Sequence, residues 1–195
     1  EFKEIYENTW SPVFIWHDMY LTCLSTTITC AEVMGLGRTE RLMRECVDKI
    51  GNWFARDDYE VVFEAVTRMN GVCLDGPKDR FVNPGHMHES AWFCMRAGEL
   101  LGEESISLRG VQITAWANRV GKDQKYGGII SYADALGGEP EPIDWFKETN
   151  SLWDEKVWWP NAEALAAYAL AYRQTGDEFY LQEFLEQHKY CMRYF

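Results

Sequence analysis

The stretch Asn83-Pro-Gly-His-Met-His-Glu-Ser-Ala-Trp-Phe93 decides the fold prediction, because its proline stands directly before a helical pattern. Proline is well tolerated in the first turn of a helix, where its missing N–H group would have no helical partner anyway. Pro12 and Pro160 precede helical patterns in the same way. The three prolines recur at intervals of about 75 residues, which indicates an internal repeat.

Each repeat predicts a helix, a glycine-containing break and a second helix. The breaks fall at residues 35–37, 102–104 and 176–177. Thr39 and Asp177 are the expected N-caps of the helices that follow two of these breaks. We therefore expect one all-α domain over residues 1–195, with helix pairs over about 11–55, 84–120 and 160–195. A closed (α/α)6 barrel needs six pairs, so this chain is expected to form the central half of such a barrel.

Two short stretches favour strands rather than helices. Residues 59–66 are rich in β-branched and aromatic side chains, and residues 126–132 are bounded by turn residues on both sides. We expect both to be β-hairpin decorations on the helical domain.

Composition excludes several classes of protein. The 195 residues carry 19 Lys+Arg against 31 Asp+Glu, a formal net charge of −12, so nucleic acid is not an expected partner. No apolar run approaches the roughly 20 residues of a membrane span. The six cysteines form no CxxC pair, which favours free thiols in a reducing compartment and hence a cytoplasmic protein.

The opening stretch also contains a possible acid/base unit. If a helix starts near Gly85, His86 and Glu89 share one face, whereas His88 points elsewhere. A carboxylate one turn away can fix the imidazole tautomer and raise its basicity. A capping or merely buried histidine is the simpler alternative. Because two histidines at i and i+2 diverge on a helix, we expect no metal site here.

A second candidate segment surrounds two adjacent tryptophans. Trp159 and Glu163 lie four residues apart, near the start of a predicted inner helix. An indole can pack on the C–H face of a sugar while a carboxylate accepts hydrogen bonds from its hydroxyl groups. Trp159 is equally compatible with the core, and Trp158 is expected to be a core residue.

Two weaker candidates would bind substrate. Trp16 occupies the corresponding place in the first inner helix, although a local structural role is the simpler interpretation. Arg80 precedes the opening stretch and could clamp an anion, although a surface salt bridge is the default for such a residue.

Taken together, these segments resemble the N-acylglucosamine 2-epimerase superfamily, which includes cellobiose 2-epimerases and related aldose–ketose isomerases. The matching stretches are Asn83-Pro-Gly-His86-x-x-Glu89-x-x-Trp-Phe93 and Lys156-Val-Trp-Trp-Pro-Asn-Ala-Glu163. The resemblance covers most of residues 75–195 and is weaker over the first 70 residues. It implies an (α/α)6 barrel of about twice this length.

The resemblance also implies cofactor-independent inversion at C2 of a reducing sugar, with N-acylglucosamine as the first expectation. One histidine removes the C2 proton, an enediolate forms, and a second histidine returns a proton to the opposite face. His86 matches one catalytic histidine, Glu89 the carboxylate one turn on, and Glu163 the carboxylate after the paired tryptophans. The second histidine and an oxyanion-stabilising arginine are expected outside these 195 residues, so this piece alone is expected to be inactive.

Two other functions remain open at this stage. A six-hairpin glycoside hydrolase would use paired carboxylates such as Glu89 and Glu163. A non-catalytic helical-repeat binding protein would use neither of them nor His86. The identity of the sugar is left open, and a homodimer is an expectation from the family alone.

Overall fold

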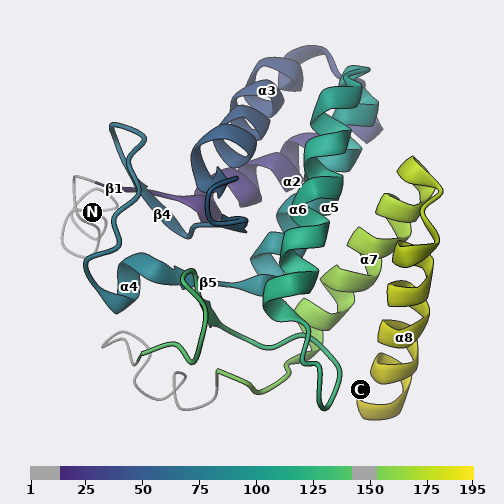
Figure 1. Cartoon of the computed structure of the whole chain (residues 1–195). Coiled ribbons are helices and arrows are strands. Elements are labelled where there is room, and N and C mark those ends of the chain that lie inside the picture. The colour runs from purple at the N-terminus through teal and green to yellow at the C-terminus, as the bar shows by residue number, and fades with distance from the viewer. Residues whose placement is uncertain (1–13, 142–152) are drawn as a thin grey trace.

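A computed structural model describes residues 14–141 and 153–195, and helices dominate it (Figure 1). The long helices are α2 His17–Met34, α3 Glu40–Asp48, α5 Pro84–Leu101, α6 Glu104–Gly121, α7 Trp158–Thr175 and α8 Glu178–Tyr194. The shorter turns are η1 Gly37–Thr39, η2 Lys49–Phe54, which is π-helical, and α4 Pro77–Arg80. The expected all-α class with small strands is confirmed.

The long helices form three consecutive hairpins, from α2/α3 through α5/α6 to α7/α8 (Figure 1). α5 packs against α2, α6 and α7, so it is the central helix of the row. Gly102 and Gly176 end α5 and α7 with a left-handed φ of 69°. A residue with a side chain adopts that conformation at a cost, which explains why the two helices stop at glycine.

Two of the predicted proline starts and one of the two predicted N-caps are found at the starts of helices. Pro84 is the first residue of α5, and Pro160 lies in the first turn of α7, whereas Pro12 is outside the described residues. Asp177 caps α8, because its carboxylate accepts a hydrogen bond from the backbone N–H of Phe179 at 2.9 Å. Thr39 precedes α3 without a side-chain cap, since its hydroxyl donates to the carbonyl of Leu36 instead.

The strands form three antiparallel two-stranded sheets beside the helices. β1 Phe14–Trp16 pairs with β4 Ala65–Thr67, β2 Ala55–Arg56 with β3 Val61–Val62, and β5 Phe81–Val82 with β6 Ala133–Asp134. The single strand predicted over 59–66 is therefore wrong, because β3 and β4 pair with different partners.

The strand predicted over 126–132 is also wrong. Within it only Ile129 makes a bridge, to Lys122. Gly127 and Gly128 both have positive φ, which turns the backbone out of an extended conformation.

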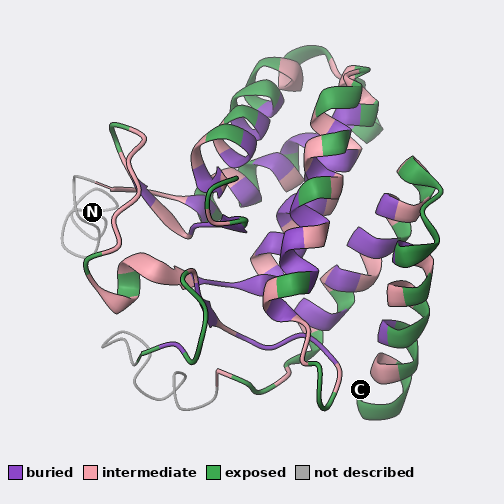
Figure 2. Ribbon diagram, in the orientation of Figure 1, coloured by how far each residue is buried: buried purple, intermediate pink, exposed green. Residues whose placement is uncertain are grey.

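The core lies between the hairpins. A large cluster joins α2, α3, η2, α5 and α6, and a smaller one joins α5, α7 and α8 around Tyr168. Burial declines toward α8, where only Tyr180 and Gln187 are buried (Figure 2). All six cysteines are free, and among the described helices none is long and apolar enough to cross a membrane.

Candidate active site

The N-terminus of α5 places His86 on the molecule's central helix. Asn83 caps the helix: its side-chain oxygen accepts from the backbone N–H groups of Gly85 at 2.9 Å and His86 at 3.2 Å. Because the preceding proline has no N–H to satisfy, the first turn is fixed by one side chain. His86 therefore projects from a rigid helix start, with a side chain 27% exposed.

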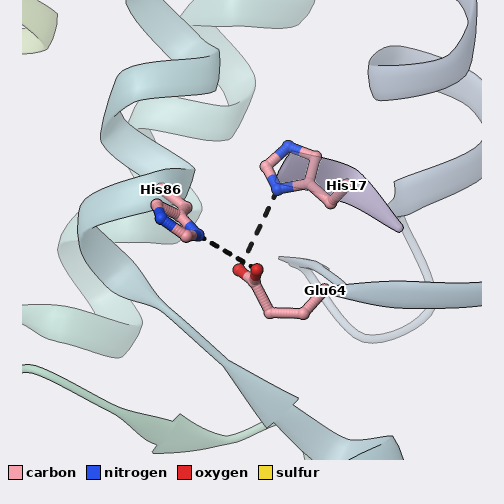
Figure 3. Close-up of side chains that lie close together, drawn as sticks. All are labelled: His17, Glu64 and His86. Atoms are coloured by element: carbon pink, nitrogen blue, oxygen red, sulfur yellow. Dashed lines mark hydrogen bonds and ion pairs between the residues drawn. The ribbon is translucent and has the colours of Figure 1, made fainter. Parts of the chain in front are cut away.

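Glu64 is the hydrogen-bond partner of His86 (Figure 3). The Nδ1 atom of His86 lies 3.0 Å from Oε2 of Glu64, in the turn between β3 and β4. The sequence predicts that Glu89 fixes the imidazole and raises its basicity: the hydrogen bond to Nδ1 comes from Glu64 instead, and the charge of Glu89 adds to that of Glu64 in raising the pKa of His86. Glu89 lies one turn away on the same helix, whereas Glu64 is brought directly against the ring by the β1–β4 pairing.

His17 completes the cluster from the first turn of α2. Its ring is completely buried, its Nε2 lies 2.7 Å from the hydroxyl of Ser90, and its Nδ1 lies 3.9 Å from Oε1 of Glu64. The ligand atoms that His17, Glu64 and His86 can offer lie within 4.8 Å of one another, so these three could hold a metal ion. His88 is separate: it is fully buried, with its ring edge-on to Tyr168 at 5.2 Å between centroids.

Electrostatics assign different charges to the three cluster residues. Burial alone would lower the pKa of His86, but the charge and hydrogen bond of Glu64 outweigh it and raise the pKa to about 9. Burial opposes ionisation of Glu64 as well, yet His86 and His17 bring the pKa of Glu64 below its usual value. Burial lowers the pKa of His17 to about 4. Near neutral pH, His86 is thus an imidazolium paired with a carboxylate, beside a neutral imidazole.

Two further carboxylates belong to the site, Glu89 on α5 and Glu163 on α7. Burial, followed by the charge of Glu163, raises the pKa of Glu89 to about 7. Burial also raises the pKa of Glu163, although the indole N–H of Trp92 donates to its Oε2 at 2.6 Å. A carboxyl group with a pKa near neutrality can serve as either donor or acceptor of a proton. Trp92 is a further site residue; it lies within residues 83–93, but its position in the sequence alone did not indicate a role.

Trp159 lies beside His86, with ring centroids 5.4 Å apart. It also lines an open cavity of about 260 Å³ together with Asn83, Ser131, Tyr132, Glu155, Val157 and Pro160. Among the described residues His86 does not line this cavity itself, but its neighbour Trp159 does. Trp158, expected in the core, is instead 68% exposed, because it is the first residue of α7 and precedes the buried face of that helix.

Of the two weaker candidates, Trp16 adjoins the cluster along the chain, whereas Arg80 is paired with carboxylates. Trp16, expected in the first inner helix, instead ends β1 and precedes α2 by one residue, so it is next to His17 of the cluster along the chain. Arg80 is held by two carboxylates, with Nε 2.9 Å from Asp134 and Nη2 2.7 Å from Glu141. That arrangement favours the salt-bridge interpretation of Arg80 over an anion clamp.

Comparisons with known proteins point to one family. The profile of the N-acylglucosamine 2-epimerase (GlcNAc 2-epimerase) family matches residues 4–195. The human N-acylglucosamine 2-epimerase is 29% identical over 168 residues, which cover 82% of this chain and 37% of that protein. A cellobiose 2-epimerase of Ruminococcus albus is 28% identical over 98 residues, covering 50% and 22%. This chain spans less than two-fifths of the length of these curated relatives.

Solved structures show the same fold. A D-mannose isomerase aligns with a TM-score of 0.76 at 17% identity, covering 95% of this chain and 46% of that one. A family 76 glycoside hydrolase from Bacteroides thetaiotaomicron aligns with a TM-score of 0.72 at 9% identity, covering 93% and 36%. The chain therefore has the fold of about half of an (α/α)6 barrel, as the helix pairs predict. A likeness shared by isomerase and hydrolase shows the fold and leaves the reaction to the site.

Proposed function

Because the chain belongs to the N-acylglucosamine 2-epimerase family, we propose that the protein of which it forms part inverts the configuration at C2 of a reducing sugar. The observation that carries this proposal is the His86–Glu64 pair, fixed at the start of α5 with an indole beside it. N-acylglucosamine is the first substrate to test, since the human and mouse relatives bear that name.

The geometry supports a proton-transfer role for His86. With Nδ1 directed to Glu64, Nε2 is the nitrogen left to exchange a proton with substrate. In the open-chain sugar the C2 proton is α to the carbonyl. Because His86 is an imidazolium near neutral pH, we assign it the donor step: a base on the opposite face of C2 removes this proton to give an enediolate, and the Nε2–H of His86 delivers a proton to its own face of C2 to give the epimer. In the reverse direction the neutral imidazole left by that step removes the proton. This chain supplies one face of that reaction, and the group on the other face is expected elsewhere in the protein.

The remaining site residues suit binding and stabilisation of charge. A neutral Glu89 carboxyl could donate a hydrogen bond to the oxyanion that develops on the former carbonyl oxygen. Glu163, oriented by the indole of Trp92, could accept from a sugar hydroxyl. Trp159 offers an indole face next to His86, on which a sugar ring could pack.

Isotope exchange tests the reaction directly. The full-length protein is incubated with N-acetylglucosamine in D2O, and deuterium at C2 is followed by NMR. We expect exchange together with formation of the manno epimer, and a decrease of 10²-fold or more in His86→Ala, since a positioned acid/base group contributes about 10²–10⁴-fold. His188→Ala, which removes the exposed histidine of α8, is the matched control and should behave as wild type.

Other outcomes would favour the alternatives. Hydrolysis of an aryl glycoside without exchange at C2 would indicate a glycoside hydrolase that uses Glu89 and Glu163. Normal exchange in His86→Ala would remove this residue from the mechanism. If the full-length protein shows neither reaction on any free aldose, a non-catalytic binding protein becomes the better interpretation.

We also propose a cellular location and an assembly for the protein. Six free thiols, of which Cys46 and Cys94 are buried, support a reducing compartment and thus a cytoplasmic protein. The acidic net charge of −12 argues against a nucleic-acid partner. A homodimer is proposed from family membership alone.

A further inference from the structure

Two buried polar atoms face each other in the His17–Glu64–His86 cluster without a hydrogen bond (Figure 3). They are Nδ1 of His17 and Oε1 of Glu64, 3.9 Å apart. Within residues 14–141 and 153–195, neither atom has another hydrogen-bond partner. A buried polar atom without a partner costs about 1–3 kcal/mol, so a pair of them in contact requires an explanation.

Neither tautomer of His17 satisfies this pair. If Nε2–H donates to the hydroxyl of Ser90, the lone pair of Nδ1 is directed at a carboxylate oxygen, and two acceptors face each other. If Nδ1 carries the proton instead, a separation of 3.9 Å is too long for a hydrogen bond. A cation between the two atoms would satisfy both of them at once.

The donor set is one that binds transition metals. Two imidazoles and one carboxylate recur in zinc sites, with metal–ligand distances of about 2.0–2.2 Å. In a tetrahedral site such distances put neighbouring ligand atoms roughly 3.4 Å apart. The two observed separations, 3.9 Å for His17–Glu64 and 3.0 Å for His86–Glu64, lie on either side of that value. The third separation, between the two imidazoles, is no longer than 4.8 Å, so side-chain shifts of up to about 1 Å would complete the geometry.

The backbone holds the three ligands in place. The N–H of His17 donates to the carbonyl of Glu64 at 2.9 Å, and Trp16 pairs with Ala65 in the β1–β4 sheet. His86 is fixed by the Asn83 cap of α5. The hydroxyl of Ser90 holds the outer nitrogen of His17, as the second sphere of a metal-bound histidine commonly does.

We propose that His17, Glu64 and His86 bind one divalent transition-metal ion of the Zn²⁺ class, and that this ion reversibly inhibits proton transfer by His86. His17 and His86 would bind through Nδ1 and Glu64 through its carboxylate. The ion would take the place of the proton shared by His86 and Glu64, so the imidazole could no longer cycle between its acid and base forms. Binding stands on the cluster alone, whereas inhibition rests on the proposed epimerase function.

Cobalt substitution tests the binding. The full-length protein, freed of metal with a chelator, is titrated with Co²⁺ and its visible absorption is recorded. We expect one equivalent to bind with the d–d bands of a four- or five-coordinate ion. No thiolate charge-transfer band should appear, which distinguishes the cluster from the exposed Cys23. Zn²⁺ should displace the Co²⁺ and abolish the spectrum.

Variants then locate the ion. His86→Ala and Glu64→Gln should each abolish the stoichiometric spectrum, and Ser90→Ala should weaken Co²⁺ binding about 10- to 100-fold while keeping all three ligands. His188→Ala is the control for surface binding and should bind as wild type. Thermal unfolding of every variant separates loss of the site from loss of the fold. His86 is the safest ligand to replace, because it is the most exposed of the three.

Opposite results would overturn the proposal. Binding that saturates at no fixed stoichiometry, or that persists in folded His86→Ala and Glu64→Gln, would exclude the cluster as the site. Loss of the spectrum in His188→Ala would place the ion on α8. For inhibition, Zn²⁺ should suppress deuterium exchange at C2 and EDTA should restore it. Tight binding without any effect on exchange would refute the inhibitory role, and tight binding in a protein without epimerase activity would refute the proposed function but not the metal site.

Discussion

The substitution Gly85→Ala tests the contact that places Trp159 beside His86. A Cβ atom at residue 85 would lie 2.5 and 2.7 Å from two ring carbons of Trp159 and 2.9 Å from Cβ of Pro160. Carbon atoms in contact are normally about 3.5–4.0 Å apart, so α7 or the indole would have to move by about 1 Å. The partly exposed indole can swing aside, whereas the buried Pro160 belongs to the first turn of α7 and moves only with the helix.

The expected cost follows from these two effects. Overpacking typically costs about 1–3 kcal/mol, and replacing a helical glycine by alanine returns at most about 1 kcal/mol. We expect the free energy of unfolding to fall by about 1–2 kcal/mol. Because a displacement of about 1 Å at an active site can cost as much as 10²-fold in rate, kcat/KM should fall by more than the loss of stability explains.

Urea unfolding followed by tryptophan fluorescence, together with the C2 exchange assay, measures both quantities. Gly37→Ala is the matched control: no atom lies within 4 Å of the position that its new methyl group would take, and its φ is not left-handed. That variant should remain within about 0.5 kcal/mol of wild type and keep full activity. Wild-type stability and kcat/KM in Gly85→Ala would refute the close α5–α7 contact and, with it, the placement of Trp159.

Three further predictions concern stability. His88 is buried with no hydrogen-bond partner for either ring nitrogen among the described residues, so His88→Leu should raise the free energy of unfolding by about 1 kcal/mol. His88→Ala leaves a cavity beside Tyr168 and should lower the free energy of unfolding by about 2 kcal/mol or more. Urea titration that shows the reverse order would contradict this prediction. Burial and Glu163 raise the pKa of Glu89 from 4.5 to about 7, so the protonated carboxyl stabilises the folded state. This stabilisation is complete below pH 4.5 and is lost as the pH rises through 7. Over that interval the free energy of unfolding of wild type should fall by about 1–2 kcal/mol relative to that of Glu89→Gln, once solvent screening is allowed for. A flat difference between the two proteins across that pH range would show that Glu89 ionises normally. Asp177→Ala removes the cap of α8 and should cost about 0.5–2 kcal/mol in thermal or urea unfolding, with Asp177→Asn close to wild type; equal losses in both variants would mean that the carboxylate charge rather than the cap matters.

Glu64 shows why part of the site escaped sequence analysis. It is the one charged residue among the apolar side chains of residues 61–66, and this isolation is the feature of the sequence that could have indicated a functional role. The β-branched and aromatic side chains of residues 59–66 predicted a single strand there, and Glu64 was given no role. The backbone instead turns between β3 and β4, and this turn directs the carboxylate to His86. No spacing rule relates residues 22 positions apart when a turn and a helix start bring them together.

The sequence by itself determined the helix pairs and the stretch that carries His86, because helix starts, glycine stops and apolar periodicity act within a few residues along the chain. The contact between Trp92 and Glu163 lies across two packed helices, and the meeting of His17, Glu64 and His86 lies across three chain segments. Only the tertiary structure decided these, since hydrogen-bond partners and burial depend on which segments lie side by side. The charge of each ionisable group follows from the same packing, because burial and a neighbouring charge shift a pKa over a few ångströms of space and not over any fixed distance in sequence.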